Sequence, residues 1–252
     1  MENHKLYFAS DFHLGAPNYQ SSRKRERQIV SWLDEVKKDA TEIFLVGDIF
    51  DFWFEYAAVI PKGFIRLQGK LAELSDAGIK IYFFKGNHDM WVFDYFKKEF
   101  DVTVIDDELI LDRNGKRFFI HHGDGLGAGD VKYKMLKKFF RSKFCQWLFA
   151  RIHPNLGIGI ANYWSSKSRL ASHQNLWVPT EGSESDWANN TYRDIRNEHG
   201  DFDFLIMGHR HNPFLIRLSE QTTYVNLGEW VNNSFYARFD GKDLELLEWK
   251  KD

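Results

Sequence analysis

Short apolar runs alternate along the chain with longer stretches of helical spacing. Five runs rich in β-branched and aromatic residues predict strands at residues 5–9, 43–46, 79–84, 117–120 and 202–207. Residues 22–39 and 62–77 carry apolar side chains at helical spacing and predict helices that cover the sheet. An Asn-Gly pair at 114–115 and an Asp-Gly pair at 240–241 are typical of β-hairpin turns. The pattern predicts an α/β fold.

Each predicted strand runs directly into a short polar motif. The motifs are Asp11-Phe12-His13, Gly47-Asp48, Gly86-Asn87-His88-Asp89, His122-Gly123-Asp124 and Gly208-His209-Arg210-His211. Because active sites of open α/β folds form at the carboxyl ends of the strands, we expect the motifs to converge. Carboxylates, neutral imidazoles and an amide oxygen are ligands that divalent Mn, Fe or Zn accept. Seven such groups suffice for two ions that share one carboxylate.

For each histidine, the interpretation as a metal ligand competes with a simpler one, because an isolated histidine beside apolar residues is more often a core residue than a ligand. The joint pattern favours the ligand interpretation for those in the motifs: His13, His122, His209 and His211. Neighbouring strand residues point to opposite faces, so His121 should face the sheet interior or a hydrogen-bonding partner. The histidines outside the motifs are interpreted as ordinary: His4, His153, His173 and His199.

Composition narrows the class of protein. The 252 residues fit one large α/β domain, 1–252, with an insertion. A single cysteine, Cys145, forms no internal disulfide, and the chain enters a strand without a signal segment, so we expect a cytoplasmic location. The net charge of -2 provides no general field for nucleic acid, and no nucleic-acid partner is expected. No apolar run reaches the roughly 18 residues of a membrane span.

Residues 125–200 separate the fourth motif from the fifth and are predicted to form a helical lid insertion. Between Lys134 and Arg151, basic residues alternate with bulky apolar ones, including Phe139, Phe140 and Trp147. Such a helix fits a membrane surface, with apolar side chains among the acyl chains and basic ones at anionic head groups. The commoner alternative is an apolar stripe that packs on the core. Its position beside the metal motifs favours a lid that handles lipid.

The ordered motifs resemble the calcineurin-like metallophosphoesterase superfamily, whose pattern is D-x-H, G-D, G-N-H-D, H and G-H-x-H. The resemblance implies an α/β/β/α sandwich of two mixed sheets flanked by helices. It also implies two metal sites, formed by Asp11, His13 and His211 and by Asn87, His122 and His209, with Asp48 bridging them. In this family the histidine at His88 is no ligand but contacts the phosphoryl oxygen or leaving group, and Asp89 is expected to orient its ring.

Over nearly its whole length the chain resembles the UDP-2,3-diacylglucosamine pyrophosphohydrolases. The similar segments are 47–53 (GDIFDFW), 130–133, 166–169 and 227–230. The resemblance implies hydrolysis of a UDP-linked acylated sugar to UMP and 2,3-diacylglucosamine 1-phosphate. It further implies two divalent ions, Mn before Fe or Zn, and peripheral attachment to the inner face of the cell membrane. The implied substrate contacts are Asn87, Asp130, Tyr133, Lys167 and Arg169.

One departure keeps alternatives open. The best-known members of that family have arginine where this chain has His88; both side chains place positive charge near a phosphate, but only histidine readily donates a proton near neutral pH. A metallophosphoesterase that acts on another nucleotide, phosphodiester or phosphoprotein is the alternative function. A metal-binding scaffold without catalysis would require lost ligands, and none is missing. The oligomeric state is left open.

Overall fold

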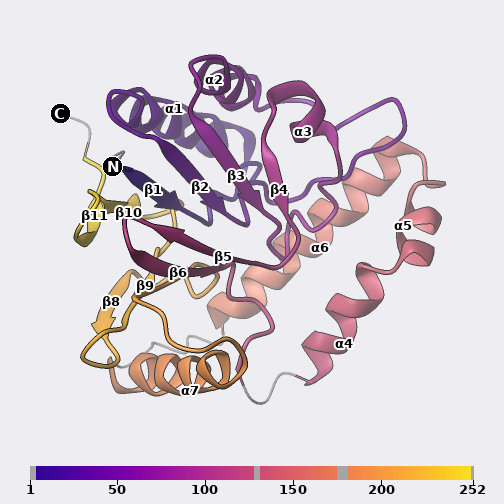
Figure 1. The fold of residues 1–252 in the computed structure, drawn as a ribbon. Coiled ribbons are helices and arrows are strands. Elements are labelled where there is room, and N and C mark those ends of the chain that lie inside the picture. Colours follow the sequence, from indigo (N-terminus) through magenta and orange to yellow (C-terminus); the bar gives the residue numbers. More distant parts are fainter. Residues whose placement is uncertain (1–3, 128–130, 175–180, 251–252) are drawn as a thin grey trace.

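A computed structural model of the chain describes residues 4–127, 131–174 and 181–250. For residues 131–132, 166–174 and 181–183 it describes only the backbone. Two mixed β-sheets pack face to face, with helices on the outer face of each (Figure 1). This is the α/β/β/α sandwich that the sequence predicts.

The first sheet contains the amino-terminal and carboxy-terminal strands of the chain. Its members are β1 (Leu6–Ala9), β2 (Glu42–Val46), β3 (Lys80–Phe84), β4 (Thr103–Ile105), β10 (Phe235–Phe239) and β11 (Leu244–Glu248). The order is β11-β10-β1-β2-β3-β4, parallel from β1 to β4 and antiparallel at β10 and β11. Parallel neighbours need crossover connections. These contain α1 (Tyr19–Val36), α2 (Ile65–Asp76) and α3 (Tyr95–Phe100).

The second sheet has a parallel centre and antiparallel edges. Its strands are β5 (Glu108–Arg113), β6 (Lys116–His121), β7 (Phe204–Met207), β8 (Phe214–Arg217) and β9 (Thr223–Asn226), in the order β5-β6-β7-β9-β8. Asn114 and Gly115 join β5 to β6 with φ angles of 53° and 74°, as a two-residue hairpin turn of the primed type requires. β10 and β11 also form a hairpin around residues 240–243. Both predicted hairpins are confirmed.

Three layers of apolar side chains hold the sandwich together. Phe8, Phe44 and Phe118 belong to the layer between the sheets, where Phe8 stacks on Phe44 with ring centroids 4.7 Å apart. The outer face of the first sheet packs against α1 and α2, the two predicted helices, through residues such as Trp32 and Leu71. α1 begins three residues before the predicted boundary because the Asn18 side chain caps it, accepting a 3.0 Å hydrogen bond from the Ser21 amide.

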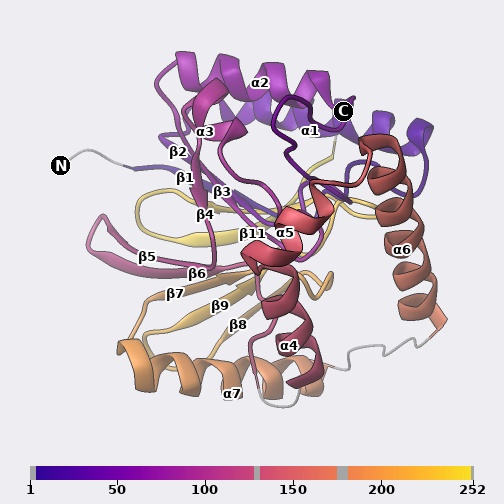
Figure 2. The ribbon, with the colours of Figure 1, turned by 90° about the vertical axis from the view of Figure 1, so that its right-hand side faces the viewer.

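The insertion consists of two parts with different surroundings. Its helices are α4 (Val131–Phe140), α5 (Lys143–Phe149), α6 (Pro154–Gln174) and α7 (Glu181–His199). Figure 2 shows α4, α5 and α6 beside the sandwich, whereas α7 lies along the second sheet. Ala188, Tyr192 and Ile195 of α7 are buried against that sheet. α7 is therefore an outer layer of the core, and we use "candidate lid" for α4–α6 alone. No described helix is both long and apolar enough to cross a bilayer.

Candidate metal centre

All seven predicted ligands lie at one edge of the sandwich. β1, β2 and β3 of the first sheet and β6 and β7 of the second end there, and each is followed by its polar motif. Among the described residues, three groups bring their ligand atoms within 4.8 Å of one another. Two of them are the predicted sets, Asp11, His13 and His211, and Asp48, His122 and His209, and the third consists of His13, Asp51 and His88. Asn87 joins the second group, since its Oδ1 lies 3.3 Å from His122 Nε2. The structure therefore assembles both predicted ligand sets.

Asp48 lies between the two groups. Its Oδ2 is 3.4 Å from Nε2 of His122 and 3.9 Å from Nε2 of His13. The carboxylate is 1% exposed, so water does not compete for it. This position matches the bridging role implied for Asp48.

The donor atoms have the spacing of a coordination shell. His211 Nε2 lies 3.1 Å from both His13 Nε2 and Asp11 Oδ1. Ligands about 2.1 Å from one ion lie roughly 3.0–3.4 Å from each other. Two imidazole nitrogens that face each other, together with buried carboxylates, suit a divalent cation of the Mn, Fe or Zn type. The residues fit two such ions.

Electrostatics prepare the site for cations. Burial alone would raise the pKa of Asp48, but the charge on His122 outweighs it and holds that pKa well below its usual range. Burial would lower the pKa of His122, yet the Asp48 carboxylate raises it to about 10. Burial lowers the pKa of His209 to about 4. The Asp48 carboxylate is therefore ionised, and a bound metal ion would take the place of the proton on His122.

Five of the seven ligands have backbone conformations that L residues rarely adopt. The φ angles are 55° at Asp11, 43° at His13, 53° at Asp48, 67° at His209 and 56° at His211. Each costs on the order of 1 kcal/mol or more, and such strain gathers at functional sites. The loops therefore aim side chains at the centre at the expense of local stability.

Two glycines leave room for the ligands. A Cβ at Gly86 would overlap the carboxylate of Asp48, and one at Gly208 would lie 2.6 Å from Asp11 Oδ2. Glycines in such motifs also favour sharp turns and close approach of the backbone to a phosphate. At these two positions the carboxylates themselves occupy the space that a side chain would take.

The surroundings of His88 correct one prediction. Asp89, expected to orient the His88 ring, instead accepts hydrogen bonds from the amides of Gly86, Ile49 and Phe50 at 2.8, 2.8 and 3.2 Å. It is fully buried, and it fixes the loop that carries Asp48.

The His88 ring has other partners. Its Nδ1 lies 3.0 Å from the carbonyl oxygen of Asp51 and 3.3 Å from Ser165 Oγ. The Asp51 carboxylate is 3.8 Å from the same nitrogen. Sequence reasoning missed both partners. A signal for Asp51 existed, because it follows Asp48 by three residues in the same motif.

His121 and His122, which are adjacent at the end of β6, have different surroundings, as the alternation of strand residues predicts. His122 Nδ1 lies 2.8 Å from the carbonyl oxygen of Val46, which leaves Nε2 free for a metal. His121 Nδ1 accepts a 2.7 Å hydrogen bond from the Gly123 amide. Burial lowers the pKa of His121 to about 3, so its ring is neutral. His121 thus faces a hydrogen-bonding partner rather than the metal centre.

Comparison with known proteins agrees with this geometry. The family described as calcineurin-like phosphoesterase matches residues 4–213. This chain belongs to the calcineurin-like phosphoesterases. It is 36% identical over 255 residues to a UDP-2,3-diacylglucosamine hydrolase of Porphyromonas gingivalis, covering 96% of each chain. A protein of the same name from Histophilus somni is 26% identical over 230 residues, covering 90% of this chain and 92% of that one.

Solved structures give a more distant likeness. The phosphoesterase Yfce of E. coli is 15% identical, with a TM-score of 0.44 over 95% of this chain and 90% of that one. The family match confirms the predicted family, and the sandwich described above confirms the predicted fold.

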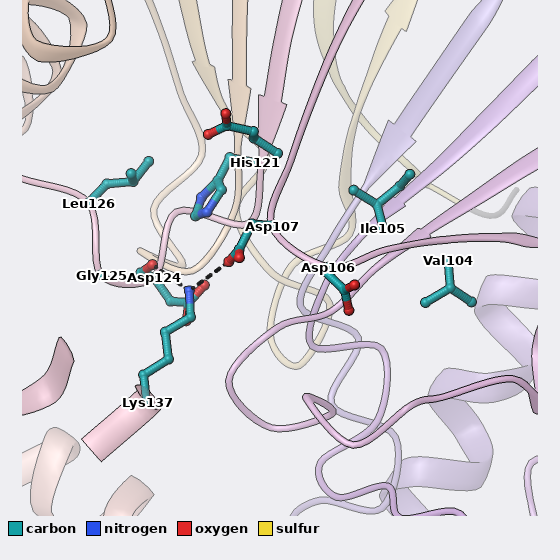
Figure 3. Close-up of a pocket in the computed structure, with 10 residues that line it drawn as sticks. Val104, Ile105, Asp106, Asp107, His121, Asp124, Gly125, Leu126 and Lys137 are labelled. Carbon is teal, nitrogen blue, oxygen red and sulfur yellow. Dashed lines mark hydrogen bonds and ion pairs between the residues drawn. The ribbon is translucent and has the colours of Figure 1, made fainter. Parts of the chain in front are cut away.

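In this calcineurin-like phosphoesterase, α4 is tied to the metal loop through Asp124. Asp124 Oδ2 accepts a hydrogen bond from the Tyr133 hydroxyl at 2.8 Å and forms an ion pair with Lys137 Nζ at 2.9 Å. Lys137 also pairs with Asp107 at 3.4 Å, and Figure 3 shows it reaching between the two carboxylates across a cleft of about 600 Å³. Burial would raise the pKa of Asp124, but His122 and Lys137 lower it to about 2. The contact remains ionic across the neutral pH range.

The predicted substrate contacts are only partly placed. Tyr133 lies next to the centre, its ring centroid 6.4 Å from that of His209, although its hydroxyl already binds Asp124. Asp130 lies outside the described residues, as do the side chains of Lys167 and Arg169 on α6. Asn87 is predicted both as a metal ligand and as a substrate contact. Its position suits both roles, because it reaches the second metal group and also lines the cavity described next.

An apolar cavity of about 550 Å³ adjoins the metal centre. Its polar lining consists of Asp51, Asn87, His88, Lys137 and Ser165. Its apolar wall, mostly from the candidate lid, consists of Phe52, Met90, Trp91, Tyr133, Leu136, Phe140, Cys145, Leu148, Phe149, Ile152, Ile160, Ala161 and Trp164. A long apolar group would lie there with its polar end beside His88.

The loop that carries His209 and His211 is braced by α7. Arg210 Nε pairs with Glu184 Oε2 at 2.7 Å, and its guanidinium lies 4.6 Å from the Trp187 ring centroid. Glu184 is fully buried. Asn226 supports the same loop by donating a 3.0 Å hydrogen bond to the carbonyl oxygen of Gly208. Neither Glu184 nor Asn226 belongs to a recognisable motif.

Proposed function

We propose that this protein hydrolyses the pyrophosphate bond of UDP-2,3-diacylglucosamine to UMP and 2,3-diacylglucosamine 1-phosphate. The observation that carries the proposal is the apolar cavity that shares Asn87 and His88 with the metal centre. A phosphoesterase for a small polar substrate has no need of such a wall. The printed names of the relatives from Porphyromonas gingivalis and Histophilus somni support the same substrate.

Some residues of the centre would bind the metal ions, and others would contact the substrate. Two divalent ions, Mn before Fe or Zn, would supply an activated water and neutralise charge on the phosphate. Asp11, His13 and His211 would hold one, Asn87, His122 and His209 the other, with Asp48 between them. No side-chain nucleophile is required, so we expect no covalent phosphoenzyme.

His88 would contact the phosphoryl or leaving oxygen through Nε2. Its Nδ1 faces the Asp51 carbonyl oxygen, which only accepts hydrogen bonds, so Nδ1 carries a proton. Nε2 is then the atom that gives up a proton when the ring is charged. A diphosphate has a good leaving group, and this suits a site that is rich in metal charge and modest in acid catalysis.

The remaining substrate contacts would lie at the candidate lid. Tyr133 lines the apolar cavity. Lys167 and Arg169 carry charges that complement the diphosphate, and Asp130 is able to accept hydrogen bonds from the sugar or ribose hydroxyls. All four follow the resemblance to the pyrophosphohydrolases.

The outward surface of the candidate lid would lie against the membrane. Phe139, Phe144 and Trp147 are 54%, 66% and 54% exposed, and Lys138 and Lys143 lie exposed among them. Apolar side chains interleaved with basic ones suit an anionic leaflet, and this supports the proposed location on the inner, cytoplasmic face of the membrane. Phe140 differs from Phe139 and Trp147 in lining the cavity.

A substrate-preference assay tests the proposal. Purified protein loaded with Mn is given UDP-2,3-diacylglucosamine in detergent and, separately, the p-nitrophenyl ester of UMP. We expect UMP release from the acylated substrate at a kcat/KM at least tenfold higher. Equal or lower efficiency with the acylated substrate would favour the alternative, a phosphoesterase for another nucleotide, phosphodiester or phosphoprotein.

A further inference from the structure

The described part of α6 touches the rest of the protein at few points. From residue 154 to residue 165, the buried residues are Gly157, which lies against Tyr56 and Phe149, and Ser165. Tyr163 and Trp164 are 64% and 62% exposed. Within residues 154–165, the position of the helix therefore depends on these two buried contacts.

Ser165 makes its contacts at the metal centre. Its hydroxyl donates a 2.9 Å hydrogen bond to Asp51 Oδ2. A hydroxyl has one proton to donate, so toward His88 Nδ1, at 3.3 Å, Ser165 Oγ acts as an acceptor and shares the single Nδ1 proton with the carbonyl oxygen of Asp51. Ser165 therefore completes a chain of hydrogen bonds from α6 through Asp51 to the His88 ring.

The same turn of α6 forms part of the apolar cavity. Ile160, Ala161 and Trp164 line it together with Ser165. Ile160 and Trp164 are 41% and 62% exposed, so an acyl chain in the cavity would remove their apolar surface from water. Occupancy of the cavity would thus favour the arrangement in which Ser165 reaches Asp51 and His88.

We propose that Ser165 is a positioning residue that couples occupancy of the apolar cavity to the orientation of the His88 ring. The proposal rests on the proposed function, since it takes His88 to contact the phosphoryl or leaving oxygen. Ser165 itself does not touch the reacting atoms. It holds His88 in place only when α6 is seated, so a substrate with acyl chains would be cut by a better-ordered centre than one without them.

A double-mutant cycle tests the coupling. We expect Ser165→Ala to lower kcat for the acylated UDP-sugar by about three- to tenfold, the scale of one neutral hydrogen bond. Bound metal should stay within about twofold of the wild type, and kcat should fall by a larger factor than KM rises, because the main effect of Ser165 is on the chemical step. In a His88→Ala background, Ser165→Ala should have no further effect, since Ser165 acts through that ring.

Two comparisons separate this role from simple support of the helix. Asn162→Ala, at an exposed position of α6, should leave kcat and KM unchanged. The p-nitrophenyl ester of UMP, which leaves the cavity empty, should show a smaller loss from Ser165→Ala than the acylated substrate does.

Several results would overturn the proposal. They are losses that multiply in the double variant, a raised KM with unchanged kcat, or the same loss with both substrates. Failure of the proposed function has a different signature, namely no preference of the wild type for the acylated substrate. In that case the same double-mutant cycle is measured with the p-nitrophenyl ester of UMP, which tests Ser165 independently of the acylated substrate. If the losses from Ser165→Ala and His88→Ala multiply in the double variant, the role of Ser165 is rejected.

Discussion

Several side chains at the metal centre serve two partners at once. Asp48 approaches both ligand groups, Asn87 belongs to the centre and to the cavity, and Asp51 faces His88 while it accepts from Ser165. Because one such side chain contributes to two parts of the site, a change at its position alters both of them. Substitutions at such positions should affect more than one measurable property.

Asp48→Ala should remove both metal ions and abolish hydrolysis. The carboxylate lies between the two ligand groups, so each coordination shell loses a member. Metal analysis of the purified variant, with circular dichroism to show that it folds, checks the prediction. Two retained ions with near-normal turnover would contradict the assignment of Asp48.

His88→Ala should slow hydrolysis by about 10²- to 10⁴-fold while metal content stays nearly intact. The ring contacts Asp51 and Ser165 and belongs to neither predicted ligand set. Turnover and bound metal measured on the same preparation provide the test. An equal loss of metal would place His88 among the ligands, and an unchanged kcat would remove its role.

The identities of the centre's residues were predictable, but their backbone geometry was not. The motifs predicted all seven side chains that the structure brings together. Nothing in the pattern indicates that His13 and His211 have positive φ, since this conformation is set by tertiary contacts. The interpretation of Asp89 was wrong for a related reason. Adjacency in sequence suggested a contact with His88, whereas the fold supplies Asp51 and Ser165 from more distant positions.

At the scale of elements, α4, α5 and α6 form the wall of a cavity and α7 braces a metal loop. Both parts come from the single insertion between β6 and β7. The helical spacing of apolar residues predicts a helix, but it does not indicate what the apolar face of that helix contacts. Such a face suits the protein core, a bound ligand or a membrane equally. For this reason the sequence predicted one lid over 125–200, and only the packing of Tyr192 and Ile195 assigns α7 to the core.

The cavity wall predicts a selective loss of activity. Leu136→Gln together with Leu148→Gln should raise KM for the acylated substrate by about tenfold, since each methylene buried contributes roughly 0.8 kcal/mol. Both leucines line the cavity and are about half exposed, at 50% and 51%, so the fold should tolerate the change.

Leu156→Gln is the matched control, because Leu156 is 60% exposed on α6 and does not line the cavity. It should leave KM unchanged. Equal losses for the acylated substrate and for the p-nitrophenyl ester of UMP would show that the wall is merely structural.

The brace from α7 predicts an effect on metal affinity. Glu184→Gln should weaken metal binding by about 10- to 100-fold, as loss of a partner behind the ligands commonly does. Arg210, between His209 and His211, would lose its buried charge partner. Titration with Mn against a competing chelator measures the change. Glu198→Gln, on the exposed side of α7, should have no effect, and an unchanged affinity in Glu184→Gln would reject the brace.

On the scale of the whole molecule, the metal centre joins the two sheets. Loops of the first sheet supply Asp11, His13, Asp48 and Asn87, and loops of the second supply His122, His209 and His211. Each ligand group draws on both sheets. The order of strands and helices predicted an α/β fold, and the resemblance to the metallophosphoesterases implied the sandwich of two sheets. The division of the ligands between the sheets depends on how the sheets stack, and the sequence pattern carries no information about that.

Removal of metal should therefore lower the thermal stability of the entire protein. Each ion at 100 times its Kd adds about 2.7 kcal/mol to the free energy of unfolding. For a chain of this size, each such contribution corresponds to a Tm change of roughly 5–11 °C, and two independent ions contribute about twice as much. Differential scanning calorimetry with Mn or with a chelator measures it. The Asp48→Ala variant is the control, and a chelator should not shift its Tm.

The origin of the ligands in both sheets also determines when the centre forms during synthesis. One predicted set needs His211 and the other needs His209, which lie beyond β7 and follow the insertion in the chain. A nascent chain that has emerged only as far as α7 has five of the seven ligands and neither complete set. Metal acquisition would thus be a late event, and nascent chains that have emerged only as far as α7 would have no complete centre.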